Sequence, residues 1–300
     1  MSSRQLARTH AVVEVEAAAG DDQRDRDRIA VLGHRLPRLQ TQADDPHRPA
    51  VRDLLESKRA WLVTGGHLVV NIIHATGIEG ARHASGTVVV IDVLRSFTVS
   101  AYALAGGAHE CRLVRTVAEA RALAATTPGS VLCAEEDALP VEGIPISNSP
   151  TAIRDADLHD RVLIQRSTAG TQAVAAVDSD HVFAASLVVA GATAGACVAT
   201  NPQTITLVAS ADHPEDHACA LYIEGLIRGE RHDLELLLAP LRDSERYARA
   251  LSGKWPGFPA TDVELSLAAD RFDFAMPVSR GQGYLRVQPQ RVAKTSRTAS

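Results

Sequence analysis

The amino-acid sequence predicts an α/β fold with a mostly parallel sheet flanked by helices. Apolar, β-branched runs such as Thr87–Val93 and Thr204–Ala209 are typical of strands that are buried on both faces of a sheet. Helical segments such as Val117–Ala125 and Glu215–Arg228 lie between these runs. Strands that alternate with helices in this way favour parallel pairing, because each helix carries the chain back across one face of the sheet.

The individual elements follow from the same patterns and from the turn residues between them. His67–Ile73 and Thr87–Val93 are predicted strands, with a connector at Ile78–His83. Gly106-Gly107 suits the end of a helix over Phe97–Ala105. The remaining predicted elements are the strands Cys111–Arg115, Ser130–Ala134, Arg161–Gln165, His181–Ala185, Thr204–Ala209, Phe272–Ser279 and Tyr284–Val287, the helices Val117–Ala125, Thr171–Val177, Leu187–Ala199, Glu215–Arg228, Leu234–Leu238, Ser244–Ser252 and Asp262–Ala268, and a long loop over Glu135–Pro150. The last two strands are expected to close the domain.

The chain is predicted to form one α/β domain over residues 63–290, preceded by a stretch of different character. Residues 1–62 are rich in charge and lack sustained apolar periodicity. They cannot bury enough apolar surface to offset the entropy lost on ordering, so we expect a mobile N-terminal extension. The alternative is that the start codon was assigned too early and these residues are not part of the native protein. Residues 291–300 are polar and are expected to fray.

Composition and charge narrow the class of protein. Hydrophobic residues make up 45% of the chain and charged residues 22%, as in ordinary soluble globular proteins. The formal net charge is −5 and there is no long basic run, which argues against nucleic-acid binding. No apolar run reaches the ~20 residues of a membrane span, and the N-terminus lacks the apolar core of a signal peptide. The cysteines are far apart, which favours buried, reduced thiols in a cytoplasmic protein over disulfides or zinc ligands.

The end of the strand Thr87–Val93 carries charge where packing alone does not require it. Asp92 follows the apolar part of the strand, Arg95 comes three residues later, and Ser96 stands at the N-cap position of the next helix. Open α/β sheets bind anions at such strand ends, where a helix N-terminus opens nearby. We therefore expect an anion site around Asp92, Arg95 and Ser96.

Polar residues also follow three later strands, in the loops Glu135–Pro150, Arg166–Thr171 and Ser210–Asp216. The carboxyl ends of parallel strands lie along one edge of a sheet, so these loops are expected to converge. Their mixture of groups suits a phosphate ester bound with Mg²⁺. Carboxylate oxygens hold the metal, while arginine and backbone N–H groups hold the phosphoryl oxygens.

Each of these residues also has a structural alternative. Asp92 and Arg95 could form an ion pair that only stabilises the strand end. Glu135 could lie in a solvated loop, and the hydroxyl groups of Ser167–Thr171 could cap the next helix. Asp216 could sit at the positive end of a helix dipole without any ligand. The residue pattern leaves these alternatives open.

In their order and wording, these loops resemble the 2-phosphosulfolactate phosphatase family. The resemblance covers roughly residues 67–230 and rests most on Val90-Ile91-Asp92-Val93-Leu94-Arg95-Ser96 and on Asn148-Ser149-Pro150. Residues that fall on motif positions are Asp92, Arg95, Glu135, Asn148, Ser149, Thr168, Gly170, Thr171, Glu215 and Asp216. The resemblance implies the α/β fold of that family. It also implies a Mg²⁺-dependent hydrolysis of 2-phosphosulfolactate to sulfolactate and phosphate, a step towards coenzyme M.

The chain departs from the family pattern in three places. Glu136 stands where the family usually has arginine, Ala169 where it usually has asparagine, and Leu187-Val188-Val189 where it usually has Phe-Leu-Asn. These changes remove hydrogen-bond donors for an anionic substrate. We therefore expect the metal-and-phosphate half of the site to be better preserved than the half that selects the substrate.

The first hypothesis is a Mg²⁺-dependent phosphatase that acts on a small, acidic organic phosphate. Its predicted residues are Asp92, Arg95 and Glu135 for catalysis, Ser96, Asn148, Ser149, Ser167, Thr168, Gly170 and Thr171 for substrate binding, and Asp92, Glu135 and Asp216 for the metal. In one mechanism a water activated by the metal attacks phosphorus, and in the other Asp92 is the nucleophile. The second hypothesis is a diverged, non-catalytic member that binds an anionic ligand or a protein partner. Whether the chain forms a homo-oligomer is left open.

Overall fold

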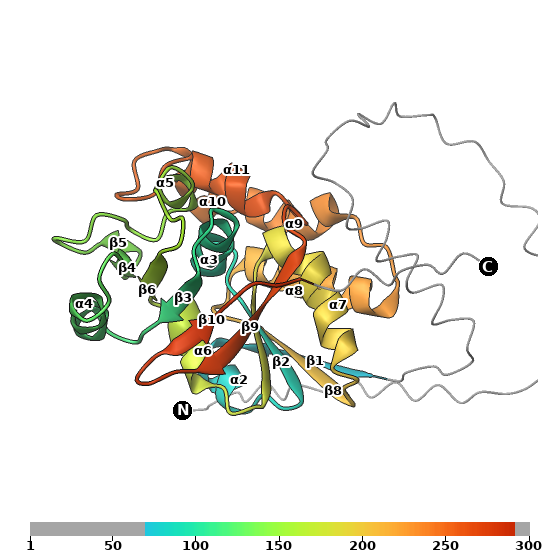
Figure 1. The fold of residues 1–300 in the computed structure, drawn as a ribbon. Helices are drawn as coiled ribbons and strands as arrows, with labels where there is room; N and C mark the ends of the chain where they lie inside the picture. The colour runs from blue at the N-terminus through green and yellow to red at the C-terminus, as the bar shows by residue number, and fades with distance from the viewer. Residues whose placement is uncertain (1–69, 292–300) are drawn as a thin grey trace, which may run out of the picture. The chain divides into compact units, whose positions relative to one another are not determined.

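The computed structural model describes residues 70–291 (Figure 1). All of these residues belong to one compact unit. The predicted N-terminal extension, residues 1–62, lies outside the described residues, as do residues 292–300 of the predicted tail. Between residues 70 and 291, no helix is both long and apolar enough to cross a membrane.

Strands and helices alternate along the described chain. The strands are β1 (Asn71–Thr76), β2 (Thr87–Ile91), β3 (Glu110–Leu113), β4 (Val131–Glu136), β5 (Leu139–Pro140), β6 (Val162–Arg166), β7 (His181–Ala185), β8 (Thr204–Ala209), β9 (Phe274–Arg280), β10 (Leu285–Val287) and β11 (Gln290–Arg291). The helices are α2 (Gly77–Arg82), α3 (Ser96–Ala105), α4 (Val117–Ala125), α5 (Pro150–Arg154), α6 (Gly170–Ala176), the 3-10 turn η2 (Leu187–Val189), α7 (Ala190–Ala199), α8 (Pro214–Arg228), α9 (Leu234–Arg242), α10 (Glu245–Leu251) and α11 (Thr261–Leu267).

The strands form a mixed sheet in the order β1-β8-β2-β7-β9-β10-β3-β6-β4-β5, with β11 paired to β9. Neighbours are parallel in the block β1-β8-β2-β7 and in the block β3-β6-β4. Between the blocks, β9 and β10 pair antiparallel with each other and with β7 and β3. The predicted α/β class, with a sheet flanked by helices, is confirmed. Parallel pairing, however, is confined to the two blocks.

The antiparallel strands β9 and β10 join the two halves of the sheet. Three successive antiparallel pairings separate β7 from β3, so the two parallel blocks run in opposite directions. These strands were expected to close the domain, and they lie in its middle instead. Their local pattern predicts strands, but it does not say which neighbours they take, because sheet pairing joins residues far apart in the sequence.

The helix α3 is buried from Ser96 to Leu104. Inner-face residues of both blocks, such as Val90 and Leu163, pack with Phe97 of α3 in one apolar cluster. A second cluster covers the opposite face of the first block beneath α7, α8 and α9, and a smaller one lies beneath α4 (Figure 1). The amino end of α3 is therefore held between the two halves of the sheet.

Two segments differ from the sequence prediction. The connector expected over Ile78–His83 is mostly the helix α2. The loop expected over Glu135–Pro150 contains β5, which forms a hairpin with β4. The residues at the hairpin turn, Asp137 and Ala138, have positive φ angles of 52° and 61°. Alanine rarely adopts such angles, so this turn has no recognisable sequence signal.

The cysteines follow the prediction of buried thiols. All of them are buried and none forms a disulfide, at Cys111, Cys133, Cys197 and Cys219. Burial raises the pKa of the Cys133 thiol to about 12, so this group stays protonated at neutral pH.

Candidate active site

Asp92 lies at the carboxyl end of β2 and caps the helix that follows. Every residue of β2 is buried. The Asp92 N–H continues the ladder by donating to the Ala185 carbonyl (3.0 Å), while its Oδ1 accepts the Ser96 N–H (2.9 Å). Ser96 was predicted as the N-cap, but it is the first helical residue, and Arg95 holds the N-cap position. The carboxylate of Asp92 thus accepts an N–H from the first turn of α3, which is the role that the Ser96 hydroxyl was expected to have.

The Asp92 carboxylate is buried, with 6% of the residue exposed. Burial raises its pKa from 3.8 to about 6, and the charges of Glu135 and Glu215 add to the rise. The Ser96 N–H and the charge of Arg246 lower this pKa in part. Within residues 70–291, Oδ2 accepts no hydrogen bond, so one oxygen of the group is free to meet a ligand.

Two further carboxylates come from the first turn of α8. Asp216 accepts the Val93 N–H at Oδ1 (2.8 Å) and the Ser210 hydroxyl at Oδ2 (3.1 Å). Glu215 is fully buried, and its Oε1 accepts the Nε–H of Arg246 (2.9 Å). The Glu215 Oε2 is buried without a partner in the described part of the chain. Burial, followed by the charges of Asp92 and Glu215, raises the pKa of Asp216 well above its usual value.

The loop between β6 and α6 approaches Asp92 from the other half of the sheet. The hydroxyl oxygens of Ser96 and Ser167 are 3.0 Å apart. Ser167 Oγ accepts the Thr171 N–H (3.0 Å), and the Thr171 hydroxyl donates to the Ser167 carbonyl (2.7 Å). A Cβ at Gly170 would lie 2.6 Å from Asp92 Oδ2, so only glycine lets α6 come this close to the carboxylate. The predicted convergence therefore occurs, although the two strands belong to blocks of opposite direction.

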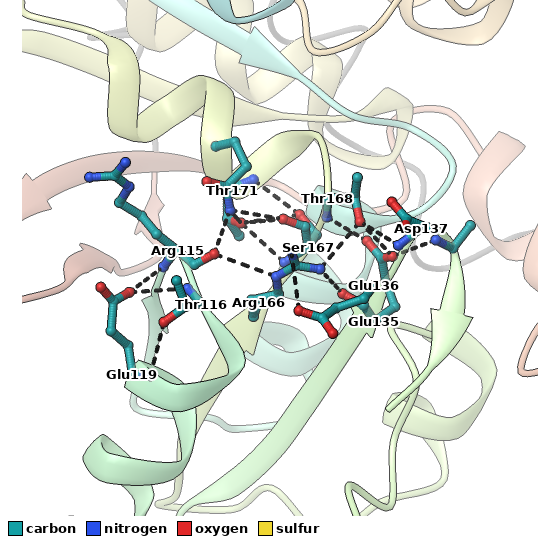
Figure 2. Close-up of polar contacts among 12 residues, drawn as sticks. Arg115, Thr116, Glu119, Glu135, Glu136, Asp137, Arg166, Ser167, Thr168 and Thr171 are labelled. Carbon is teal, nitrogen blue, oxygen red and sulfur yellow. Dashed lines mark hydrogen bonds and ion pairs between the residues drawn. The ribbon is translucent and has the colours of Figure 1, made fainter. Parts of the chain in front are cut away.

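Glu135 binds this loop to the β4–β5 hairpin (Figure 2). Its Oε1 accepts the Thr168 N–H (2.6 Å), and its Oε2 accepts the Thr168 hydroxyl (2.9 Å) and the Ala138 N–H (2.7 Å). The guanidinium of Arg166 donates to the Glu135 carbonyl and lies 3.7 Å from the Glu136 carboxylate. Both oxygens of Glu135 thus hold protein groups, and one of them holds the strained turn at Ala138.

Arg95 points into the protein and not towards Asp92. Its guanidinium forms a buried ion pair with Asp262 (2.7 Å), donates to the Gly257 carbonyl (2.6 Å) and stacks on Phe258 at 4.0 Å. Only 3% of its side chain is exposed. Arg95 therefore pairs with Asp262, and the alternative prediction of an ion pair between Arg95 and Asp92 is wrong. The contacts of Arg95 fasten the start of α3 to α11 and to the segment before it, which differs from the phosphate-gripping role predicted for it.

The loop before α5 lies behind the amino end of α3. Asn148 has a positive φ of 44°, and its Oδ1 accepts the side-chain amide of Gln165 (2.9 Å). Ser149 caps α5 through the Ala152 N–H (3.3 Å) and donates its hydroxyl to Asp262 (2.7 Å). Both residues are buried, and a role in substrate binding stays a prediction for them.

Sequence reasoning missed three residues that organise this region. Gln165 is fully buried and donates to the Ser96 carbonyl (2.8 Å) and to Asn148, while the Ser100 hydroxyl donates to it (2.6 Å). An amide inside the apolar run of β6 was an available signal. Asp262 and Arg246 gave none, because both reach the site from helices at the end of the chain.

Whether a divalent cation fits this site depends on which side-chain oxygens are left free of hydrogen bonds. Between residues 70 and 291, no three side chains of the types His, Cys, Asp and Glu are grouped as metal ligands. Among the residues that the structure describes, Asp92 and Glu215 each keep one carboxylate oxygen without a hydrogen bond, whereas Glu135 and Asp216 use both. Mg²⁺ is commonly held by one or two carboxylates together with water and substrate phosphate. Two free carboxylate oxygens beside the buried Asp216 fit that pattern.

Comparison with known proteins places the chain in a family. The model of the 2-phosphosulpholactate phosphatase family matches residues 73–256. A probable 2-phosphosulfolactate phosphatase of Bacillus subtilis (strain 168) is 42% identical over 147 residues, which is 47% of this chain and 64% of the relative. Relatives with the same description from Deinococcus radiodurans and Carboxydothermus hydrogenoformans are 32% and 34% identical, over 61% and 63% of their own lengths. The chain therefore spans somewhat less than two-thirds of the length of these relatives. Because the family match covers more than half of the sequence and contains every loop of the Asp92 site, the chain belongs to the 2-phosphosulfolactate phosphatase family.

Proposed function

We propose that this protein is a phosphatase that hydrolyses the phosphate monoester of a small, acidic organic molecule. The observation that carries the proposal is the buried Asp92 carboxylate, which has one unbonded oxygen and lies where loops from both halves of the sheet meet. Membership of the family supports a phosphatase role, and the names of the relatives support 2-phosphosulfolactate as the substrate. Its products would be sulfolactate and phosphate. The link to coenzyme M rests on the family resemblance. The cytoplasmic location and a homo-oligomeric state stay predictions.

We propose Mg²⁺ as the cofactor, held by Asp92 and Glu215 through the oxygens that lack hydrogen bonds. The raised pKa of Asp92 and of Asp216 shows that the protein alone leaves these charges poorly compensated. When bound, the ion would supply the positive charge that draws electrons from phosphorus and lowers the pKa of water. Asp216 and Glu135, both predicted as ligands, would instead position the loops, because their oxygens bind Val93, Ser210, Thr168 and Ala138.

The chain's own residues prepare the site in two ways. The Ser96 N–H fixes Oδ1 of Asp92, so that Oδ2 alone is presented. The Ser96 and Ser167 hydroxyls, 3.0 Å apart beside this carboxylate, would donate hydrogen bonds to phosphoryl oxygens. Groups fixed before the substrate arrives need no reorganisation during the reaction, which is how such sites stabilise developing charge.

The decisive experiment measures phosphate release by the purified protein with a panel of phosphorylated carboxylic and sulfonic acids, in Mg²⁺ and in EDTA. We expect release that depends on Mg²⁺ and is lost in Asp92→Asn, while the exposed Asp180→Asn control keeps it. Acid quenching during turnover and mass spectrometry of the intact protein separate the two mechanisms, because an aspartyl phosphate at Asp92 adds the mass of a phosphoryl group. No release with any acid, together with thermal stabilisation by these acids, would favour the non-catalytic binder.

A further inference from the structure

The arginine that faces the carboxylates of the site is Arg246, which comes from α10. Its side chain is 22% exposed, whereas the side chain of Arg95 is 3% exposed. Its guanidinium bonds Glu215, in the first turn of α8, and the carbonyl of Leu94, two residues after Asp92. Arg246 thus links the start of α8 to the segment that follows Asp92.

The guanidinium of Arg246 is fixed from two sides. Its Nε–H donates to Glu215 Oε1 (2.9 Å), and its Nη2 donates to the Leu94 carbonyl (3.0 Å), two residues after Asp92. The group lies 5.6 Å from the centre of the Trp255 ring. Within the described residues, Nη1 has no hydrogen-bond partner. A guanidinium held in this way leaves the two N–H groups of Nη1 unbonded, with their orientation already set.

The ion pair between Arg246 and Glu215 leaves one guanidinium nitrogen and one carboxylate oxygen unbonded in the described residues. Arginine and carboxylate groups that serve only each other commonly form two parallel hydrogen bonds. Here the pair has one such bond, which leaves Glu215 Oε2 and Arg246 Nη1 unused on neighbouring groups. A fully buried carboxylate oxygen without a partner is costly, and a cation at Oε2 would relieve that cost, while an anion could bind the N–H groups of Nη1.

We infer that Arg246 binds the phosphoryl group of the substrate through Nη1, in the role that the sequence suggested for Arg95. This inference rests on the proposed function, since it names the residue that recognises phosphate at the same site. Glu215 would connect the two parts, because Oε1 orients Arg246 and Oε2, which is buried without a partner in the described residues, is the oxygen proposed to hold the metal. The arginine would add charge that neither the Ser96 hydroxyl nor the Ser167 hydroxyl can supply.

The test measures binding of inorganic phosphate by isothermal titration calorimetry, in Mg²⁺, for wild type, Arg246→Met and Arg246→Lys. Loss of one charge-assisted hydrogen bond is expected to weaken phosphate binding by about 10- to 100-fold in Arg246→Met. Arg246→Lys should recover part of this loss, because it restores the charge without the fixed geometry. The control is Arg249→Met, which removes the exposed guanidinium that stacks on Trp255 at 4.0 Å and should bind phosphate like wild type.

The outcomes separate this inference from the proposed function. Equal phosphate binding by wild type and folded Arg246→Met overturns it, as does a wild type that binds no phosphate. If Arg246→Met does not fold, the comparison is made with Arg246→Lys, and equal phosphate binding by this variant and wild type overturns the inference. A wild type that hydrolyses none of the acids can still bind phosphate more tightly than Arg246→Met. That result supports the inference and refutes the phosphatase proposal. Turnover with an unchanged kcat/KM in Arg246→Met refutes the inference and leaves the proposal standing.

Discussion

Replacing Asp92 by asparagine should make the metal-free protein more stable at neutral pH. The Asp92 carboxylate is buried beside other acidic groups, and burial is the largest cause of its raised pKa. Asparagine has nearly the same shape and can still accept the Ser96 N–H that Oδ1 accepts at 2.9 Å. The substitution therefore removes a poorly compensated charge and keeps the helix cap.

The size of the effect follows from the pKa of Asp92. A change from 3.8 in the unfolded chain to about 6 in the folded protein, at about 1.4 kcal/mol per pH unit, corresponds to about 3 kcal/mol. The folded protein binds the proton more tightly, so this part of the stability falls as pH rises from about 4 to 6 and stays low above that range. Below pH 4 the group is neutral in both states, and the cost disappears.

The assay is urea denaturation of wild type and Asp92→Asn in EDTA at several pH values from 4 to 8. We expect the variant to gain about 3 kcal/mol over wild type at pH 7.5 and to gain little at pH 4. The exposed Asp180→Asn is the matched control and should show no such dependence. A variant that is equally stable or less stable than wild type at pH 7.5 would refute the reasoning. Added Mg²⁺ should narrow the difference, since only wild type has the full ligand set.

Other substitutions test the surrounding contacts. Gly170→Ala places a Cβ 2.6 Å from Asp92 Oδ2, and we expect a loss of about 1–3 kcal/mol in the free energy of unfolding together with weakened phosphate binding, measured by urea denaturation and calorimetry. Asp262→Ala leaves the buried Arg95 without its partner and should cost about 3–5 kcal/mol; a loss below 1 kcal/mol would show that the ion pair matters little. Gln165→Leu removes the amide hydrogen bonds to the Ser96 carbonyl and to Asn148 Oδ1 and should lower stability by about 1–3 kcal/mol in thermal denaturation, with Gln165→Glu separating the loss of the amide from the loss of shape.

The bounds of a helix or strand could be predicted where the sequence signals both its start and its end. The helix Val117–Ala125 agrees with its predicted bounds, and its start is fixed by a capping box between Thr116 and Glu119. The strands His181–Ala185 and Thr204–Ala209 also agree, because each is a short apolar run between turn residues. The reversal of direction between the two halves of the sheet was missed. It depends on where β9 and β10 pair, and no local pattern contains that information.

The candidate site was predicted from strand ends, which explains which of its residues the structure brings together and which it does not. Asp92 was chosen because a carboxylate directly after an apolar strand has few structural uses, and its role in catalysis stays a prediction. Arg95 was paired with it because the two are close in sequence. Residues three apart across a strand end can point in different directions, and here Arg95 pairs with Asp262 while Asp92 accepts the Ser96 N–H. Closeness in sequence could not identify Arg246, because α8 and α9 lie between Glu215 and the helix α10 that carries the arginine.

The opposed directions of the two sheet halves explain how the loops still meet. In a fully parallel sheet, the edge would bring them together side by side. In this fold the loops meet at the amino end of α3. The Ser96 side chain contacts Ser167, which follows β6 in one half, and the Ser96 N–H donates to Asp92, which follows β2 in the other half. Gly170 and Gln165 fill the remaining space without adding charge. The carboxylates of Asp92, Glu215 and Asp216 come from the residue after β2 and from the first turn of α8, and all three are buried. Burial and the charges of neighbouring carboxylates raise the pKa of Asp92 and of Asp216, so a cation bound as proposed would stabilise the folded protein.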